Sequence, residues 1–272
     1  MSTASINKTS KLFIESDMSV AESIDLSPGK VVILCRRCPG KSEPNDDSAA
    51  VIQTSNGAVV LIAADGIGGA PAGHKASAIA VESVAQCVEE ADATGDLRPA
   101  ILDGIELANR GILDLGIGAA TTLAVVEIQN QIARAYQVGD STTLVIGQRG
   151  ALKWKSTPHS PVGYAVESGM LEEAEAMHHD ERHIVSNLVG SRDMHIDIGP
   201  CRRLAPRDTV VVGSDGLFDN LHLNEVIERA RIGKPLDRVM ELAKLATTRM
   251  TGSLSDVPGK PDDLTVLLFT SG

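Results

Sequence analysis

Two acidic segments of the sequence have the residue types and spacing to bind divalent metal ions. Asp47 precedes an apolar run over residues 49–54, and Asp65 follows a second run that begins at residue 58. The Asn56-Gly57 pair between the two runs is typical of a tight turn joining antiparallel strands. The sequence therefore predicts a β-hairpin with one aspartate at the open end of each strand.

The register of this hairpin decides how close the two carboxylates lie. With a three-residue turn, Thr54 pairs with Ala58, and the same register places Asp47 opposite Asp65. A two-residue turn would shift the pairing by one position only. Adjacent carboxylates repel one another, so this arrangement destabilises the fold unless a cation lies between them.

Four further aspartates stand at the ends of predicted strands or in a turn between them, namely Asp46, Asp140, Asp215 and Asp262. Strand starts and strand ends alternate along one edge of an antiparallel sheet, so these residues can gather there although they are far apart in the sequence. Clustered carboxylates without cysteine ligands suit hard cations such as Mg²⁺ or Mn²⁺. Two such ions ~4 Å apart can activate a water for attack on a phosphate ester.

A simpler interpretation is that each aspartate only stabilises a turn, since Asp is common where strands end. That interpretation suffices for any one of these residues. It does not account for an Asp-Gly pair that follows an apolar strand twice, at Asp65-Gly66 and at Asp215-Gly216. Acid pairs also precede two other predicted strands, so the combination favours a shared metal site.

The elements that must position these residues are strands and helices of a single predicted domain over residues 29–272. We interpret residues 1–28 as a tail or an irregular lead-in. Residues 155–194 predict an excursion from the sheet with a short helix over 171–177. Apolar residues at helical spacing predict helices over 71–91, after Asp96, over 223–231 and over 236–251. Short apolar runs predict strands over 31–34, 49–54, 58–64, 121–128, 132–138, 144–146, 209–212 and 262–269.

The composition excludes several classes of function. The 272 residues carry a formal net charge of −11 with no run of basic residues, which argues against binding to nucleic-acid phosphates. Aromatic residues make up only 2% of the chain, so the core must be aliphatic and stacking platforms for single strands are absent. No apolar stretch approaches the ~20 residues of a membrane span, and no apolar signal region is seen. We expect a cytoplasmic monomer that binds neither nucleic acid nor membrane.

Other residues that can bind metals have simpler interpretations. Cys35 and Cys38 form a lone C-x-x-C without a second pair, and we interpret them as reduced cysteines on or after a strand. His178, His179 and His183 lie close together in the excursion, where we expect solvated or helix-capping roles.

The acidic motifs occur in an order that resembles the metal-dependent protein serine/threonine phosphatases of type 2C, the PPM family, in their compact bacterial form. The resemblance covers about residues 30–270. It rests on Asn45–Ser48, similar to N-E-D-[AS], on Asp65–Gly69, similar to D-G-[HM]-G-G, on Gly118–Thr122, on Val138–Ser141, which matches V-G-D-S, on Ser214–Asp219, which matches S-D-G-L-[FW]-D, and on Asp262–Val266, similar to D-[ND]-[IL]-T-V.

This resemblance implies an α+β fold, a four-layer α-β-β-α sandwich of two packed antiparallel sheets with a helix pair outside each. It implies hydrolysis of phosphoserine and phosphothreonine on proteins, with Asp47 and Asp65 as catalytic residues. The implied cofactors are two Mn²⁺ or Mg²⁺ ions, with a third more weakly held. By the same resemblance Asp65 bridges two ions, the Gly66 carbonyl binds one, Asp215 and Asp262 bind the other, Asp46 and Asp47 bind metal-held waters, and Asp140 holds the third ion.

Three departures from the family pattern bear on the reaction. The usual phosphate-binding arginine is replaced by Ser42, so Lys41, or Arg37 in the same loop, is the candidate phosphate ligand. Thr142 replaces the arginine that often follows V-G-D-S. Ile67 replaces the histidine of animal members, which leaves metal-held water or a histidine such as His159 to protonate the leaving group.

Two functions are therefore compared. The first is an active phosphatase whose partner is a phosphorylated protein, a kinase or a kinase target. The second is a regulatory module of the same fold that binds a phosphoprotein with little turnover. The complete set of aspartates favours the first, and the missing arginine is what supports the second.

Overall fold

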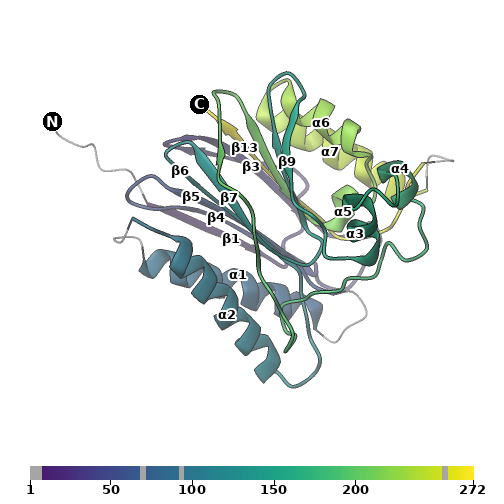
Figure 1. Ribbon diagram of the computed structural model, residues 1–272, viewed down its shortest axis with the longest axis horizontal. Coiled ribbons are helices and arrows are strands. Elements are labelled where there is room, and N and C mark those ends of the chain that lie inside the picture. The colour runs from purple at the N-terminus through teal and green to yellow at the C-terminus, as the bar shows by residue number, and fades with distance from the viewer. Residues whose placement is uncertain (1–7, 68–71, 92–94, 253–256) are drawn as a thin grey trace.

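In the computed structural model, residues 8–67, 72–91, 95–252 and 257–272 are described, and they form two antiparallel sheets that pack face to face (Figure 1). The first residues of the predicted lead-in, Gly68 and Gly69 of the second motif, and residue 71 of the first predicted helix lie outside the described residues. The predicted α+β sandwich is confirmed.

The first sheet contains the predicted hairpin at its centre. Its strand order is β1-β4-β5-β6-β7-β10, and β11 also pairs with β7. The strands are β1 (Thr9–Ile14), β4 (Asp47–Gln53), β5 (Val59–Asp65), β6 (Leu123–Gln129), β7 (Ile132–Val138), β10 (Asp197–Ile198) and β11 (Arg202–Arg203).

The second sheet has the strand order β2-β3-β13-β12-β8-β9. The last strand of the chain, β13, therefore lies inside this sheet, between β3 and β12, which brings Asp262 beside the end of β12. The strands are β2 (Glu22–Leu26), β3 (Gly29–Arg36), β8 (Thr142–Ile146), β9 (Leu152–Lys155), β12 (Thr209–Gly213) and β13 (Leu264–Ser271).

A helix pair covers the outer face of each sheet (Figure 1). The pair α1 (Gly73–Glu90) and α2 (Arg98–Asp114) covers the first sheet, and α6 (Leu223–Arg231) and α7 (Pro235–Met250) cover the second. Three short helices, α3 (Pro161–Glu167), α4 (Glu173–Ala176) and α5 (Asp215–Phe218), lie at the right-hand ends of the strands in Figure 1, below α6 and α7. No helix of the described ranges is long and apolar enough to cross a bilayer.

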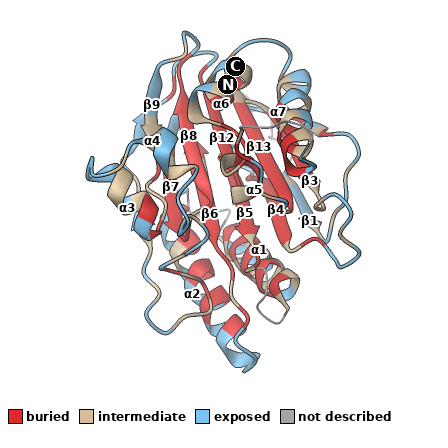
Figure 2. Ribbon diagram, turned by 90° about the vertical axis from the view of Figure 1, so that its right-hand side faces the viewer, coloured by how far each residue is buried: buried red, intermediate tan, exposed pale blue. Residues whose placement is uncertain are grey.

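The four layers enclose three apolar clusters, which explains why the central strands are apolar without a break. In β4, Ala49 and Val51 face the cluster between the two sheets, whereas Ala50 and Ile52 face α1 and α2. All seven residues of β4 are buried, and Figure 2 shows the same for neighbouring strands. A strand covered on both faces cannot alternate apolar and polar residues. Each fully buried aliphatic side chain stabilises the folded state by about 1.5–3 kcal/mol relative to leaving it exposed.

The expectation of an irregular lead-in was wrong for residues 9–14 and 22–26, which contribute one strand to each sheet, and it holds for residues 15–21 between them. β1 pairs with β4, and β2 pairs with β3. Both are edge strands: Phe13 of β1 and Ile24 and Leu26 of β2 enter the core between the sheets, while Leu12 of β1 is exposed. Backbone pairing to an existing strand stabilises such a segment, and the weak hydrophobic pattern gave little sign of it.

The excursion between β9 and β10 holds more helix than the sequence analysis predicted. The expected short helix is α4, and α3 precedes it. The hydroxyl of Ser160 accepts a hydrogen bond from the backbone N–H of Gly163, and Pro161 occupies the first turn. Ser-Pro is a helix-start signal that was available in the sequence.

Candidate active site

The predicted hairpin register is confirmed, and it places Asp47 directly opposite Asp65. At the other end, the Thr54 N–H donates to the Ala58 carbonyl at 2.9 Å, and the Asn56 side chain accepts from the Ala58 N–H at 3.1 Å. The three-residue turn thus fixes which residues meet at the open end, seven pairs away. A local turn therefore determines the position of the two carboxylates.

Asp47 is fully buried, and its two carboxylate oxygens have different surroundings. Oδ2 accepts a hydrogen bond of 2.7 Å from the Ser214 hydroxyl, whereas Oδ1 has no hydrogen-bond partner in the described part of the chain. Burial raises the pKa of Asp47 well above its usual value, and the Ser214 hydrogen bond opposes this shift. An oxygen without a partner in such a site is suited to bind a cation or a water.

The backbone of Asp65 is held by the start of β6. The Asp65 carbonyl accepts hydrogen bonds of 2.8 Å from the Thr121 hydroxyl and from the Thr122 N–H, and the Asp65 N–H donates to the Thr122 hydroxyl at 3.2 Å. Desolvation raises the pKa of Asp65 well above its usual value, and the charges of Asp215 and Asp47 raise it further. The Gly118–Thr122 motif therefore fixes the end of β5.

Three further carboxylates approach from the second sheet. Asp215 begins α5, Asp219 lies one helical turn later, and Asp140 precedes β8. Desolvation, followed by the charge of Asp215, raises the pKa of Asp140 to about 8 and that of Asp219 to about 6. Asp215 Oδ1 is buried and has no hydrogen-bond partner among the described residues. These groups repel one another, as expected for carboxylates that share a site.

Asp262 completes this side of the cluster, next to the start of β13. Desolvation, followed by the charge of Asp215, raises the pKa of Asp262 to about 7. Its neighbour Asp263 has a different role: one oxygen accepts from the Cys38 N–H at 2.7 Å, and the other from the Asp46 N–H at 2.6 Å. Asp263 therefore ties the loop before β4 to the second sheet.

Two lysine ammonium groups lie among the carboxylates. Lys41 Nζ lies 2.7 Å from Asp46 Oδ2 and 2.5 Å from Asp263 Oδ2. Lys260 Nζ pairs with Asp215 and lies 3.1 Å from Asp262 Oδ2. The aspartates of the cluster outnumber these two cations, which leaves a strongly negative site.

Glycine follows both key aspartates because the backbone passes another segment closely there. A Cβ atom on Gly66 would lie 2.3 Å from the Gly73 carbonyl oxygen, and one on Gly216 would lie 1.9 Å from the Asp263 carbonyl oxygen. Both distances are far below van der Waals contact. The repeated Asp-Gly pair therefore reflects two close backbone approaches beside the carboxylates.

The site's chemistry fits hard divalent cations. Its ligand atoms are oxygens, and buried oxygens of Asp47 and Asp215 lack hydrogen-bond partners within the described part of the chain. The raised pKa values of Asp140 and Asp262 show that the metal-free cluster resists holding its full negative charge. Mg²⁺ and Mn²⁺ prefer carboxylate oxygen ligands, so the residues present fit such ions.

The two candidate phosphate ligands are in different surroundings. Lys41 is at the site, bound to Asp46 and Asp263 as described above. Arg37 faces away, with its guanidinium 3.2 Å from Asp17 Oδ2 and hydrogen-bonded to the Ser42 carbonyl at 3.3 Å.

His159 belongs to a separate cluster, with His195 and Asp197, whose ligand atoms lie within 4.8 Å of one another. The geometry argues against a metal ion there. His159 Nδ1 accepts a hydrogen bond from the Gly139 N–H at 3.1 Å, and the Asn187 amide nitrogen lies 2.8 Å from it. The proton of the neutral ring is then on Nε2, 3.1 Å from Asp197 Oδ2, so Nε2 has no lone pair for a metal.

A role for His159 as proton donor to a leaving group also finds no support in its position. The ring is fully buried, and burial lowers its pKa. It is not among the residues that line the cavity described next. Another imidazole at the site is that of His74 in α1, whose Nδ1 lies 3.8 Å from Asp46 Oδ1.

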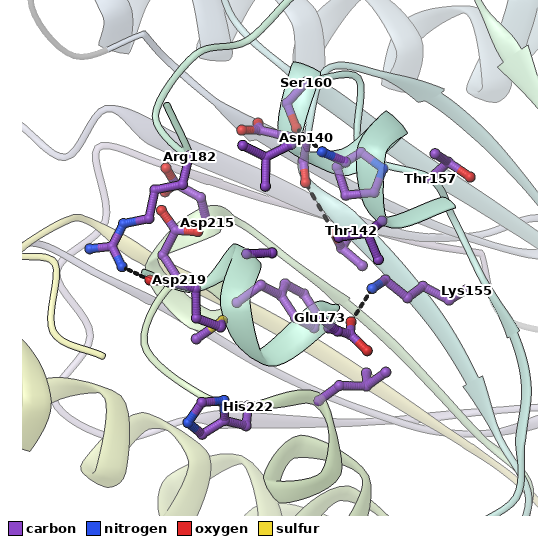
Figure 3. A pocket seen from close by; sticks show the side chains of 18 of the residues that line it. Asp140, Thr142, Lys155, Thr157, Ser160, Glu173, Arg182, Asp215, Asp219 and His222 are labelled. Carbon is purple, nitrogen blue, oxygen red and sulfur yellow. Dashed lines mark hydrogen bonds and ion pairs between the residues drawn. The ribbon is translucent and has the colours of Figure 1, made fainter. Parts of the chain in front are cut away.

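A cavity of about 640 Å³ opens beside the carboxylates (Figure 3). Its charged lining consists of two cations, Lys155 and Arg182, and five carboxylates, and Lys155 pairs with one of these, Glu173. The five carboxylates are those of Asp140, Glu167, Glu173, Asp215 and Asp219. Much of the remaining lining is apolar and comes from α3, the end of α4, α5 and α6, including Val162, Val166, Met177, Phe218, Leu223 and Ile227. The excursion between β9 and β10 thus forms one side of a cavity that adjoins the acidic cluster.

Sequence reasoning missed three residues of the cluster: Asp219, Lys260 and Asp263. Asp219 and Asp263 stand inside motifs that were quoted, and the spacing of four residues from Asp215 to Asp219 predicts one helical face. Lys260 had no comparable signal, since nothing in its neighbourhood indicates which way its side chain points.

The family model described as protein phosphatase 2C matches residues 36–256, and the chain therefore belongs to the protein phosphatase 2C family. Protein phosphatase PhpP of Streptococcus pneumoniae is 30% identical over 211 residues, covering 74% of this chain and 84% of that protein. The solved serine/threonine phosphatase of S. agalactiae is 29% identical, with a TM-score of 0.76 over 89% of this chain and 99% of that one.

A further solved structure, the catalytic domain of the serine threonine protein phosphatase PstP in complex with two manganese ions, has a TM-score of 0.72 over 89% of this chain and 98% of that one. At 21% identity it shows a common fold. The relatives together identify the chain as an enzyme of the protein serine/threonine phosphatase class.

Proposed function

We propose that this enzyme hydrolyses phosphoserine and phosphothreonine on proteins with a water activated by two divalent ions, Mn²⁺ or Mg²⁺. The observation that carries this proposal is the direct pairing of Asp47 with Asp65 in neighbouring strands, with Asp215 and Asp262 brought to the same edge. Such a concentration of carboxylates destabilises the metal-free protein. It is explained if divalent cations neutralise it.

The residues that would hold the ions follow from the family resemblance and from this arrangement. Asp65 would bridge the two ions, the Gly66 carbonyl would bind one, and Asp215 and Asp262 would bind the other. Asp46 and Asp47 would bind the waters around them, and Asp140, with its unusually high pKa, would hold a weaker third ion. When bound, such ions lower the pKa of water and neutralise the phosphoryl group.

The protein's own groups orient the reactants. The Ser214 hydroxyl holds one oxygen of Asp47 and leaves the other to accept a hydrogen bond from the attacking water. Lys41 is the better placed of the two candidate phosphate ligands, because its ammonium already lies beside Asp46 whereas Arg37 binds Asp17. A lysine binds phosphate as a point charge, without the bidentate geometry of arginine.

The substrate would be a phosphorylated protein, a kinase or a kinase target, with residues next to the phosphoamino acid entering the cavity beside Asp140. The shape of the cavity supports this, because it adjoins the acidic cluster and is lined mainly by apolar side chains. A cytoplasmic location and a monomeric state remain predictions of the sequence.

The alternative, a phosphoprotein-binding module with little turnover, keeps one supporting feature, the absence of an arginine at position 42. The complete set of aspartates favours an active enzyme.

Replacing the bridging carboxylate separates the two functions. Asp65→Asn should lower kcat for a phosphothreonine peptide in Mn²⁺ by several orders of magnitude, since the amide cannot neutralise two cations. Asp25→Asn, which removes an exposed carboxylate paired with Lys30, should leave kcat unchanged. Equal turnover by wild type and Asp65→Asn would refute the bridging role, and no turnover by the wild type would favour the binding module.

A further inference from the structure

The ammonium group of Lys260 lies at the centre of three carboxylates. Its Nζ pairs with Asp215, and lies 3.2 Å from Asp219 Oδ2 and 3.1 Å from Asp262 Oδ2. The three partners come from two segments, the short helix α5 and the residues before β13. The side chain is only 24% exposed, so this ammonium has exchanged most of its water for carboxylate oxygens.

The backbone of Lys260 is fixed by a buried asparagine. The Asn220 side chain accepts a hydrogen bond from the Lys260 N–H at 2.8 Å and donates one to the Lys260 carbonyl at 2.9 Å. The same amide nitrogen donates to the Gly216 carbonyl at 2.9 Å. Since these bonds attach residue 260 to α5, its ammonium can leave the carboxylates only by rotation of its own side chain.

Two of the three carboxylates, Asp215 and Asp262, are those that the proposed function assigns to one metal ion. Lys260 Nζ contacts Oδ2 of each. Asp215 Oδ1 has no hydrogen-bond partner among the described residues, but a divalent cation bound there would lie close to the ammonium on Oδ2 of the same carboxylate, and like charges at such a separation repel strongly. The lysine and the ion are therefore alternative occupants of one position.

We propose that Lys260 is an intramolecular competitor of the metal ion bound by Asp215 and Asp262. In the metal-free protein its ammonium reduces the repulsion among Asp215, Asp219 and Asp262. Metal binding requires this ammonium to leave, so the lysine weakens the affinity of this position and ties its occupancy to the metal concentration. This inference rests on the proposed two-metal function and adds to it a regulation of the same site.

A different role for Lys260 has the opposite consequence for metal affinity. If the lysine remained in place and only held α5 against the segment before β13, its removal would disorder the ligands and weaken metal binding. If it competes, its removal should strengthen metal binding while it destabilises the metal-free protein. The sign of the change in affinity therefore separates the two roles.

The test measures Mn²⁺ binding directly, by isothermal titration calorimetry on the metal-stripped full chain, without turnover. Lys260→Met keeps the length of the side chain and removes its charge. It should bind Mn²⁺ at the position formed by Asp215 and Asp262 at least about tenfold more tightly, or about 1.4 kcal/mol. Lys260→Arg keeps a cation and should bind as weakly as the wild type. Lys30→Met, which removes an exposed lysine paired with Asp25, is the matched control and should also leave the affinity unchanged.

Thermal unfolding gives a second readout. Without metal, Lys260→Met should have a lower Tm than the wild type, because three carboxylates lose their cation. Saturating Mn²⁺ should raise the Tm of this variant by more than it raises the wild-type Tm, because tighter binding stabilises the native state more. Lys260→Gln provides the same comparison if the methionine variant does not fold.

Unchanged or weaker Mn²⁺ binding in the charge-removing variants would overturn the competition. That result is distinguishable from failure of the proposed function, which would appear as wild-type hydrolysis that persists in chelator. Absence of Mn²⁺ binding in both wild type and variant would contradict both proposals.

Discussion

The hydroxyl of Ser214 donates a hydrogen bond of 2.7 Å to Oδ2 of Asp47, and this bond joins the two sheets at the edge that carries the acidic cluster. Ser214 follows β12 of the second sheet, and Asp47 begins β4 of the first. The Ser214 oxygen also accepts from the Thr265 N–H at 3.0 Å. One buried hydroxyl thus ties the Asp47 carboxylate of the first sheet to β12 and β13 of the second.

Ser214→Ala should therefore affect both stability and activity. It leaves the Asp47 carboxylate and the Thr265 N–H without their partner, and an unsatisfied buried polar group costs about 1–3 kcal/mol. Urea unfolding in chelator should show a loss of this size, and kcat should fall because Asp47 is no longer oriented. Ser23→Ala, at an exposed position of β2, is the control. Equal unfolding free energies of the two variants would exclude the structural role.

The stability of the metal-free protein should depend on pH in an unusual direction. The pKa values of Asp140 and Asp262 are about 8 and about 7 in the folded state, above the ~3.9 of an unfolded aspartate. Between a pH of ~3.9 and a pH of about 8, the folded state binds more protons than the unfolded state. The free energy of unfolding therefore falls as the pH rises. In chelator, the Tm should be higher at a pH of about 6 than at about 8.

Metal should change this pH dependence. Because metal ions and protons compete for the same carboxylates, saturating Mn²⁺ should flatten or reverse the trend. Asp140→Asn removes one of the titrating groups and should reduce the slope measured in chelator, while Asp25→Asn should not. A Tm in chelator that rises toward alkaline pH would show that repulsion among these carboxylates does not destabilise the folded state.

The rate of hydrolysis by this enzyme should depend strongly on the basicity of the leaving group. Ile67 stands where animal members of the family carry a proton-donating histidine, its N–H donates to the Ala120 carbonyl at 3.0 Å, and its side chain has no proton to give. His159 is buried away from the cavity and cannot replace it. General acid catalysis contributes ~10²-fold or more to such reactions. An aryl phosphate, with its weakly basic leaving group, should therefore react much faster than phosphothreonine peptides.

Ile67→His should narrow this difference by helping the peptides more than the aryl ester. The measurement is kcat for a series of leaving groups, with wild type and variant compared in the same Mn²⁺ concentration. Ile67→Gln, which adds a polar group without an acid of suitable pKa, is the matched control. Identical slopes of log kcat against leaving-group pKa in all three proteins would show that position 67 has no part in proton transfer.

The parts of the site that could be predicted from the sequence are those fixed by local chain geometry. The Asn56-Gly57 turn and two apolar runs determine the register, so the pairing of Asp47 with Asp65 followed without knowledge of the fold. The ends of β12 and β13 carried the same signal, an aspartate next to an apolar strand. Motif order then placed these segments in one family and implied the four layers.

The parts that could not be predicted depend on contacts between distant segments. Lys260 enters the cluster because Asn220, 40 residues earlier, holds its backbone. Lys41 binds Asp263, 222 residues later, and no local pattern indicates that pairing. β1 and β2 were missed because edge strands are stabilised by pairing with a neighbour more than by their own apolar residues.

If metal ions bound by this acidic cluster drive hydrolysis, the rate must depend on the concentration of the metal. Metal-stripped wild-type protein is titrated with Mn²⁺ while the release of phosphate from a phosphothreonine peptide is followed. We expect no release above background in chelator and a rate that rises and saturates with Mn²⁺. Release that proceeds at the full rate in chelator would contradict the account.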